Sequence, residues 1–114
     1  MTEKALEEKL VAGVKALGGI AFKFVSPGNA GVPDRMVILP GGIILFAELK
    51  ATRGVLSKIQ KYQIARLERM GASVQLVQGE KGVTRFLRVC AEQLTRRVAI
   101  SNEIYTAQLP AIRD

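Results

Sequence analysis

The chain contains no histidine and a single cysteine, Cys90. Without histidine there can be neither a histidine-ligated zinc site nor a histidine general base. One cysteine cannot form an internal disulfide or a thiolate metal cluster, and the helical apolar stripe around Cys90 predicts an inert core residue. Few hydrolytic mechanisms remain, and one of them combines carboxylates, a lysine and a metal ion.

Long apolar segments are also missing. No run approaches the roughly 20 residues that are needed to span a bilayer. The first residues, Met1 to Lys4, lead into a segment broken by charges, which is not the pattern of a signal peptide. We therefore expect a cytoplasmic protein with no membrane partner.

Acidic residues are scarce: 10 Asp and Glu stand against 17 Lys and Arg, giving a formal net charge of +7. A basic surface favours a polyanionic partner, nucleic acid before an anionic membrane. On charge alone, a merely soluble basic protein is the alternative. The 114 residues suit one domain, and 48% hydrophobic residues can form a small core.

The apolar pattern predicts elements in the order helix, strand, strand, strand, helix, strand, helix. The expected helices cover residues 3–17, 57–71 and 80–97, and the expected strands cover 20–25, 35–39, 43–49 and 73–77, with a turn at Gln78-Gly79. This order fits an α/β fold, a mixed β-sheet flanked by helices on both faces. The strand 43–49 is apolar almost throughout, so we expect it to be central and covered on both faces.

The last residues show no clear period. They are nevertheless too apolar for a free tail, because they include Ile100, Ile104, Tyr105, Leu109 and Ile112. We therefore separate a domain of residues 1–98 from a C-terminal extension of residues 99–114. The extension is expected to pack on the domain or on a second copy of it.

Two acids and one lysine stand at the ends of neighbouring strands. Asp34 precedes the strand 35–39, while Glu48 and Lys50 end the strand 43–49 and share one of its faces. A hairpin around Pro40-Gly41-Gly42 would bring Asp34 beside them. Glu48 and Lys50 could simply neutralise each other, but one lysine does not balance two clustered acids. Two carboxylates and a backbone carbonyl suit Mg²⁺, and the lysine can polarise a water, a set typical of phosphodiester hydrolysis.

The pattern Pro33-Asp34…Glu48-Leu49-Lys50 resembles the PD-(D/E)xK nuclease signature. The segments on either side make the resemblance more specific. The signature is preceded by Lys23-Phe24-Val25-Ser26-Pro27-Gly28 and followed by Gly54-Val55-Leu56-Ser57 and Gln60. Over about residues 4 to 90 this order is similar to the VRR-NUC family, in its short stand-alone form from bacteria and phages. The resemblance implies a restriction-endonuclease-like core and a protein encoded by a bacterium or by a phage in a bacterial host.

The resemblance also implies roles for the central residues. Asp34 and Glu48 would bind Mg²⁺ or Mn²⁺, aided by the Leu49 carbonyl, and Lys50 would orient or activate the attacking water. Gln60 would help to position water or phosphate. Gln60 also stands three residues after Ser57, which is the spacing of a capping box, and one side chain does not easily serve both roles.

A glutamate of the first helix completes the metal site in this family and in the similar archaeal Holliday-junction resolvases. Glu7, which borders the apolar stripe of Leu6 and Leu10, fits that position, with Glu8 as the fallback. Without the resemblance, a solvated helix charge would be the better interpretation.

Seven residues are candidates for contacts with the nucleic acid. They are Lys23, Ser26, Asn29, Arg35, Arg53, Lys58 and Lys61. The alternatives are a lysine that reaches solvent, an ordinary glycine- and proline-rich turn at residues 26–33, and a solvated helix face. No Gly-Lys-Ser/Thr follows that turn, so we expect no small-molecule cofactor.

These observations predict a metal-dependent, structure-selective DNA endonuclease similar to a Holliday-junction resolvase. Two symmetric cuts across a branched DNA require two active sites, so we expect a homodimer. The alternatives are flap or nick processing, a sequence-specific restriction-like nuclease, and a non-catalytic module that only binds nucleic acid.

Overall fold

The computed structural model describes residues 1–112, and for residues 101–102 and 104–112 it describes the helical backbone only. Its elements are α1 (Glu3–Ala16), β1 (Ile20–Lys23), β2 (Arg35–Leu39), β3 (Ile43–Lys50), α2 (Lys58–Arg69), β4 (Val74–Gln78) and α3 (Gly79–Ile112). The strands form one sheet in the order β1-β2-β3-β4. β1–β2 and β2–β3 are antiparallel, and β3–β4 is parallel. The expected mixed α/β sheet is confirmed.

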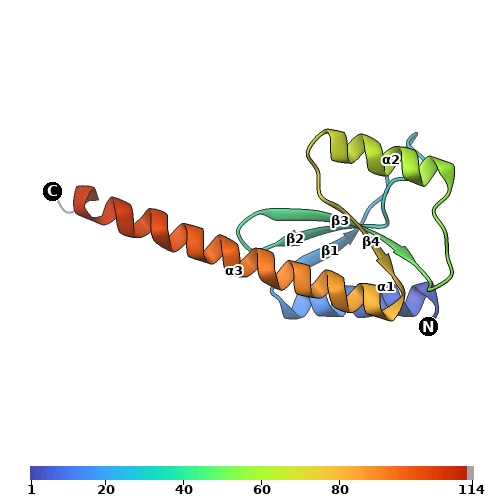
Figure 1. Ribbon diagram of the computed structural model, residues 1–114, viewed down its shortest axis with the longest axis horizontal. Coiled ribbons are helices and arrows are strands. Elements are labelled where there is room, and N and C mark those ends of the chain that lie inside the picture. Colours follow the sequence, from blue (N-terminus) through green and yellow to red (C-terminus); the bar gives the residue numbers. More distant parts are fainter. Residues whose placement is uncertain (113–114) are drawn as a thin grey trace.

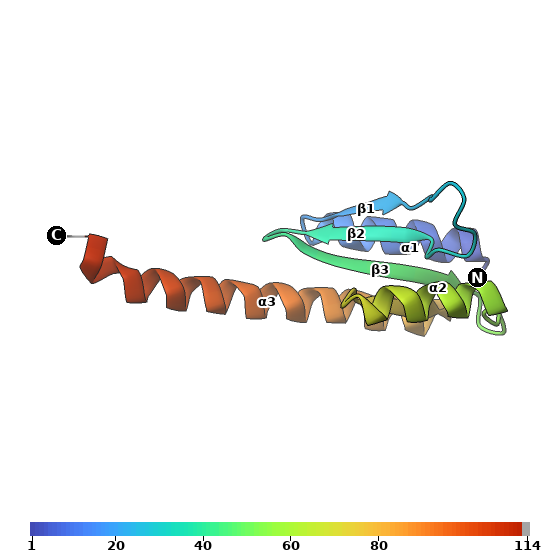
Figure 2. The same cartoon turned by 90° about the horizontal axis from the view of Figure 1, so that it is seen from above.

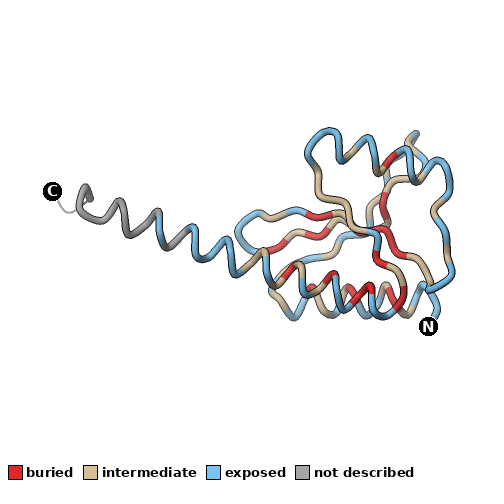
Figure 3. The backbone as a smooth tube through the Cα atoms, in the orientation of Figure 1, coloured by how far each residue is buried: buried red, intermediate tan, exposed pale blue. Residues whose placement is uncertain are grey.

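The helices lie in two layers (Figure 1). α1 and α3 cover one face of the sheet, and α2 lies on the other side. The core is between the sheet and the α1/α3 layer, as the buried segments in Figure 3 indicate. Its fully buried members include Leu6, Leu10 and Val14 of α1, Val37, Leu45, Ala47 and Leu49 of the sheet, and Val83, Phe86 and Cys90 of α3. Cys90 is thus a core residue, and burial raises the pKa of its thiol to about 11.

Three features fix α1 in place. The hydroxyl of Thr2 caps the helix by accepting a hydrogen bond from the Ala5 N–H at 3.1 Å. At Gly13 the helix approaches α3 so closely that a Cβ atom would lie 2.3 Å from Leu87 Cδ1. The ion pair between Lys9 and Glu80 at 2.8 Å links the same two helices.

β3 is central, but only one of its faces is covered along its whole length. Leu45, Ala47 and Leu49 are buried against the α1/α3 layer, whereas Ile44 on the opposite face is 50% exposed. Figure 2 shows the reason: α2 lies over the β4 side of the sheet and leaves β1 and β2 uncovered. The expectation of cover on both faces was therefore wrong for the first half of β3.

Three element boundaries also differ from the sequence expectation. β1 ends at Lys23 rather than residue 25, although the Phe24 N–H still donates to the Asp34 carbonyl at 2.9 Å. Gln78 is the last residue of β4, and Gly79 starts α3 directly, so the expected turn does not form. Gly79 makes this possible because its φ is +65°.

The last helix is longer than expected. α3 continues from Gly79 to Ile112 and extends beyond the sheet, instead of ending near Arg97 (Figure 1). No glycine or proline stands between Arg97 and Leu109, so nothing in the sequence ends the helix there. The domain boundary expected at residue 98 falls inside this helix. The packing expected for the side chains of Ile104, Tyr105, Leu109 and Ile112 lies outside the described residues. Within the described part of the chain, no helix is long and apolar enough to cross a membrane.

The glycine-rich loop between β1 and β2 packs against the start of α2. Gly31 has φ +86°, and a Cβ atom there would lie 2.9 Å from the backbone of Ile59. The carboxamide of Gln63, itself buried, donates to the Ala30 carbonyl at 3.0 Å. The loop is therefore anchored to α2 immediately before Asp34.

We expect Gly31→Ala to lower the free energy of unfolding by about 3 kcal/mol, from the positive φ and the contact with Ile59 together. Gly28→Ala is the matched control, because Gly28 has φ +79° but nothing within 4 Å of an added Cβ. It should cost only about 1 kcal/mol. Urea unfolding of both variants measures the difference, and equal losses would contradict the close packing at Gly31.

Candidate active site

The start of β2 and the end of β3 bring Asp34 and Glu48 together. The antiparallel register pairs Arg35 with Ala47, so Asp34 lies beside the last residues of β3. The Leu49 N–H donates to Asp34 Oδ2 at 2.8 Å, which fixes this carboxylate at the edge of the strand. Lys50 Nζ lies 3.8 Å from Glu48 Oε2. The convergence of two acids and one lysine that the hairpin predicts is present in the structure.

Glu48 is 1% exposed, although it is an acid in a strand with apolar neighbours. Its Oε2 faces Lys50 and accepts a hydrogen bond from Gln60 Nε2 at 3.1 Å. Its Oε1 is buried without any hydrogen-bond partner in the described part of the chain. Burial first, and then the charge of Asp34 and a side-chain hydrogen bond with it, raise the pKa of Glu48 to about 7, although the ammonium of Lys50 acts in the opposite direction. The group is thus a carboxyl that lacks one compensating partner.

Gln60 completes the capping box and also reaches Glu48. Its Oε1 accepts from the Ser57 N–H at 2.9 Å, and the Ser57 hydroxyl accepts from the Gln60 N–H at 3.2 Å, which completes a capping box. Its Nε2 remains free to donate to Glu48. Because the cap consumes the oxygen, the nitrogen must face the acid, and the expectation of a conflict was wrong.

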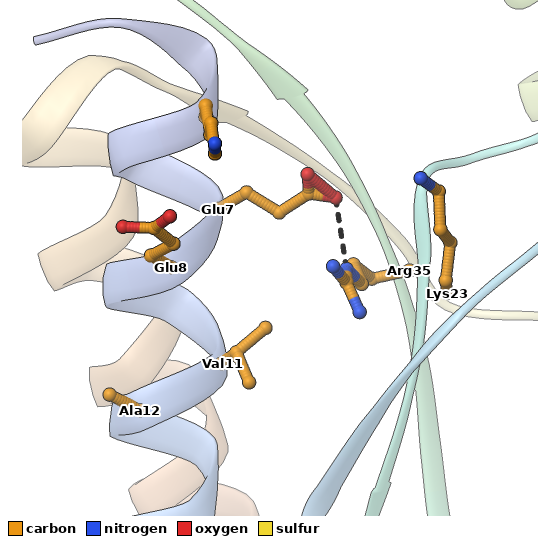
Figure 4. Close-up of a pocket in the computed structure, with 7 residues that line it drawn as sticks. Glu7, Glu8, Val11, Ala12, Lys23 and Arg35 are labelled. Atoms are coloured by element: carbon orange, nitrogen blue, oxygen red, sulfur yellow. Dashed lines mark hydrogen bonds and ion pairs between the residues drawn. The ribbon is translucent and has the colours of Figure 1, made fainter.

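Glu7 forms an ion pair with Arg35. Its Oε1 accepts from Arg35 Nε at 3.0 Å, and Arg35 Nη1 also donates to the Ala21 carbonyl at 3.1 Å (Figure 4). Both side chains lie along a cavity of about 540 Å³ between α1 and the β1 edge. Glu8 and Lys23 line the same cavity. The structure therefore places Glu7 in an ion pair with Arg35, and the guanidinium of Arg35 is already occupied.

Glu3, exposed in the first turn of α1, was not among the residues expected at the site, and its charge is the smallest influence on Glu48. Its negative charge is one of the causes that raise the pKa of Glu48. Glu3 precedes Glu7 by four residues and so shares its side of α1. That four-residue spacing is the signal by which the sequence could have suggested Glu3.

The candidate nucleic-acid contacts fall into three groups. Arg53, Lys58 and Lys61 are exposed near the site, on the turn after β3 and on the first turns of α2. Ser26 and Asn29 instead stabilise their own turn, because Asn29 Nδ2 donates to Ser26 Oγ at 2.9 Å. Lys23 is exposed on the β1 edge, beside Arg35 in the sheet register.

In the described residues, no group of three or more His, Cys, Asp or Glu side chains is arranged to hold a metal ion. The ligands on hand are the two carboxylates of Asp34 and Glu48 and nearby backbone carbonyls. An all-oxygen set with few protein ligands is compatible with Mg²⁺, which keeps several of its own waters.

Comparisons with known proteins agree with this geometry. The chain is 49% identical, over 72 residues, to "Putative nuclease p44" of Acyrthosiphon pisum secondary endosymbiont phage 1, a match that spans 63% of this chain and 77% of that protein. A solved structure described as a VRR_NUC domain superposes with a TM-score of 0.72 at 31% identity, covering 75% of this chain and 94% of the other. The chain belongs to the VRR-NUC family. No family model matches it. The VRR-NUC fold and the phage relative together support a nuclease function, and the resemblance found in the sequence is confirmed.

The raised pKa of Glu48 predicts how pH affects the stability of this VRR-NUC protein without added metal. Between the ordinary value of 4.5 and about 7, the folded protein holds a proton on Glu48 that the unfolded chain has released. The contribution of Glu48 to stability therefore falls as pH rises through this window, by about 3 kcal/mol. Glu48→Gln removes this dependence. Urea unfolding in EDTA at several pH values should show the wild type losing stability relative to the variant, and parallel curves would contradict the prediction.

Proposed function

We propose that this VRR-NUC protein is a metal-dependent DNA endonuclease whose centre is formed by Asp34, Glu48 and Lys50. The observation that carries the proposal is the buried Glu48 carboxylate with one oxygen unpartnered and a second carboxylate beside it. Such an arrangement is costly unless a proton or a cation compensates the charge. A divalent ion coordinated by both acids would remove this cost.

The donor set fits Mg²⁺ or Mn²⁺. Asp34 and Glu48 would hold the ion, with the Leu49 carbonyl as a further oxygen ligand and waters in the remaining positions. A helix-one acid would complete the set through water, because no third acid is grouped with Asp34 and Glu48 in the described residues. Glu7 is one candidate, although its pairing with Arg35 favours Glu3 for this role. When bound, the ion would supply Lewis-acid stabilisation of the negative charge that develops at phosphorus.

Lys50 acts on the attacking water, and Gln60 acts on Glu48. Lys50 donates to and orients the attacking water, and its charge favours the ionised form of Glu48. Gln60 holds Glu48 Oε2 in a fixed direction through the 3.1 Å hydrogen bond, because the capping box already fixes its carboxamide. Arg53, Lys58 and Lys61 would contact phosphates on either side of the cut, which makes binding salt-dependent and largely independent of sequence.

We also propose a structure-selective enzyme that acts as a homodimer on branched DNA. A domain of this size has little surface for reading bases, which favours recognition of DNA shape. The part of the sheet that α2 leaves uncovered carries Ile20, Phe22 and Ile44, each about half exposed, and this apolar surface could be covered by a second copy.

The proposed chemistry predicts metal-dependent cleavage that needs Lys50. Labelled four-way junction, flap, duplex and single strand should be incubated with Mg²⁺, Mn²⁺ or EDTA, and cleavage should occur with metal, most rapidly on the junction. Lys50→Ala should lower kcat by about 100-fold or more, while binding persists. Lys15→Ala, a change of the same kind at an exposed position at the far end of α1, serves as the matched control. Binding without cleavage by the wild type in either metal would favour a non-catalytic module.

Two symmetric cuts predict a dimer in solution. Gel filtration with light scattering at micromolar concentration, with and without DNA, should give twice the mass of one chain. Ile44→Glu, which places a charge on the uncovered sheet face, should shift this equilibrium toward the monomer. A monomer under both conditions would exclude the resolvase-like activity, whereas flap or nick processing would remain compatible with it.

A further inference from the structure

The turn that follows Lys50 is closed tightly on itself. The Gly54 N–H donates to the Ala51 carbonyl at 2.8 Å, which places Thr52 and Arg53 at the tip of the turn. This segment joins β3, the strand that ends in Lys50, to the loop that leads to Ser57 and Gln60. Any displacement of the turn would therefore act on the site from the side of Lys50.

Gln78, the last residue of β4, holds this turn. It lies beside Lys50 in the sheet register. Its Nε2 is 2.6 Å from the Gly54 carbonyl oxygen, 3.2 Å from that of Thr52 and 3.4 Å from that of Ala51. A carboxamide has two N–H protons, so one side chain satisfies carbonyls from most of the turn. No other side-chain carboxamide in the described residues donates to three carbonyls.

The next residue lets the turn come this close. A Cβ atom at Gly79 would lie 2.8 Å from Thr52 Oγ1, so a larger residue there would push the turn away from β4. Gln78 and Gly79 together thus form the surface on which the turn rests.

Gly54 connects the turn to Lys50, because the two residues are in close contact. A Cβ atom at Gly54 would lie 3.3 Å from Lys50 Cδ, so the aliphatic part of the lysine runs directly alongside the glycine. The far end of the same side chain is 3.8 Å from Glu48 Oε2. The position of Gly54 therefore limits where the Lys50 side chain can lie.

We propose that Gln78 is a positioning residue for Lys50: its carboxamide fixes the 51–54 turn, and the turn keeps the lysine beside Glu48. In this proposal Gln78 acts through Gly54, to whose carbonyl it donates. The inference rests on the proposed role of Lys50. Placement errors of about 1 Å can reduce a rate by about 100-fold, which is the range in which such a residue operates.

The test replaces the donor without changing the size of the side chain. Gln78→Met is expected to lower kcat by about 10-fold to 100-fold through Lys50, with a much smaller rise in KM, because Arg53 lies on the same turn but is only one of several proposed phosphate contacts. Gln75→Met is the matched control: Gln75 is on the same strand, but its carboxamide donates only to the Ser73 hydroxyl, at 3.3 Å. It should cleave at the wild-type rate. An unchanged kcat in Gln78→Met, or an equal loss in the control, would overturn the proposal.

A second measurement separates this inference from the nuclease function itself. In the metal-free wild-type protein, NMR should show proximity between the Lys50 Hδ and Gly54 Hα protons. That signal should disappear in Gln78→Met and persist in Gln75→Met. If it persists in Gln78→Met, the positioning role is wrong even if the wild type cuts DNA. If it disappears while the wild type cuts no DNA, the positioning of Lys50 by Gln78 is supported and the proposed nuclease activity is wrong. Gln78→Leu provides the same comparison if Gln78→Met does not fold.

Discussion

The charge of one buried carboxyl group governs the arrangement of this protein. Glu48 lies between the core residues Ala47 and Leu49 on a central strand, yet its own side chain points to the opposite face, where Asp34 adds a second negative charge. Lys50 and Gln60 compensate one of its oxygens, and the other has no partner in the described structure. The α1/α3 layer supplies the stability that allows this acid to be buried, because it packs on the other face of the same strand. The fold thus maintains a site that is unfavourable on its own, as is common where a cation or a reacting group must bind.

The two helices beside the site contribute by different means. α2 reaches Glu48 through Gln60, whose direction is determined by the cap that starts the helix, and Gln63 ties the same helix to the loop before Asp34. α1 is held by its buried stripe and by the Arg35–Glu7 pair. Glu3, in the first turn, is the acid of this helix whose charge adds slightly to the raised pKa of Glu48. Local signals that normally serve helix stability therefore also orient the acids. The VRR-NUC similarity is consistent with this arrangement, since it extends over three quarters of the chain.

Much of the fold could be predicted because its signals are local. The apolar stripe of α1, the apolar run of β3, the cap at Ser57 and the glycines around Pro40 each depend on neighbouring residues only, and the order of elements follows from them. The ends of elements were less certain. Gln78 and Gly79 resemble a turn, but pairing with Lys50 keeps Gln78 in the sheet. α3 continues because no residue after Arg97 breaks it, and the irregular apolar spacing there concealed a continuous helix.

The sequence by itself limited the available chemistry: without histidine few hydrolytic mechanisms remain, and Asp34, Glu48 and Lys50 at strand ends indicate one that is based on acids and a lysine. It also determined that the two acids would meet, because a hairpin around Pro40-Gly41-Gly42 allows one main register. Only the tertiary structure decided that Glu7 pairs with Arg35, how the Gln60 carboxamide is divided between the cap and the acid, and that Gln78 holds the turn beyond Lys50. Those contacts join residues that are distant in the chain, and their distances depend on how helices pack on a sheet, which no local pattern encodes.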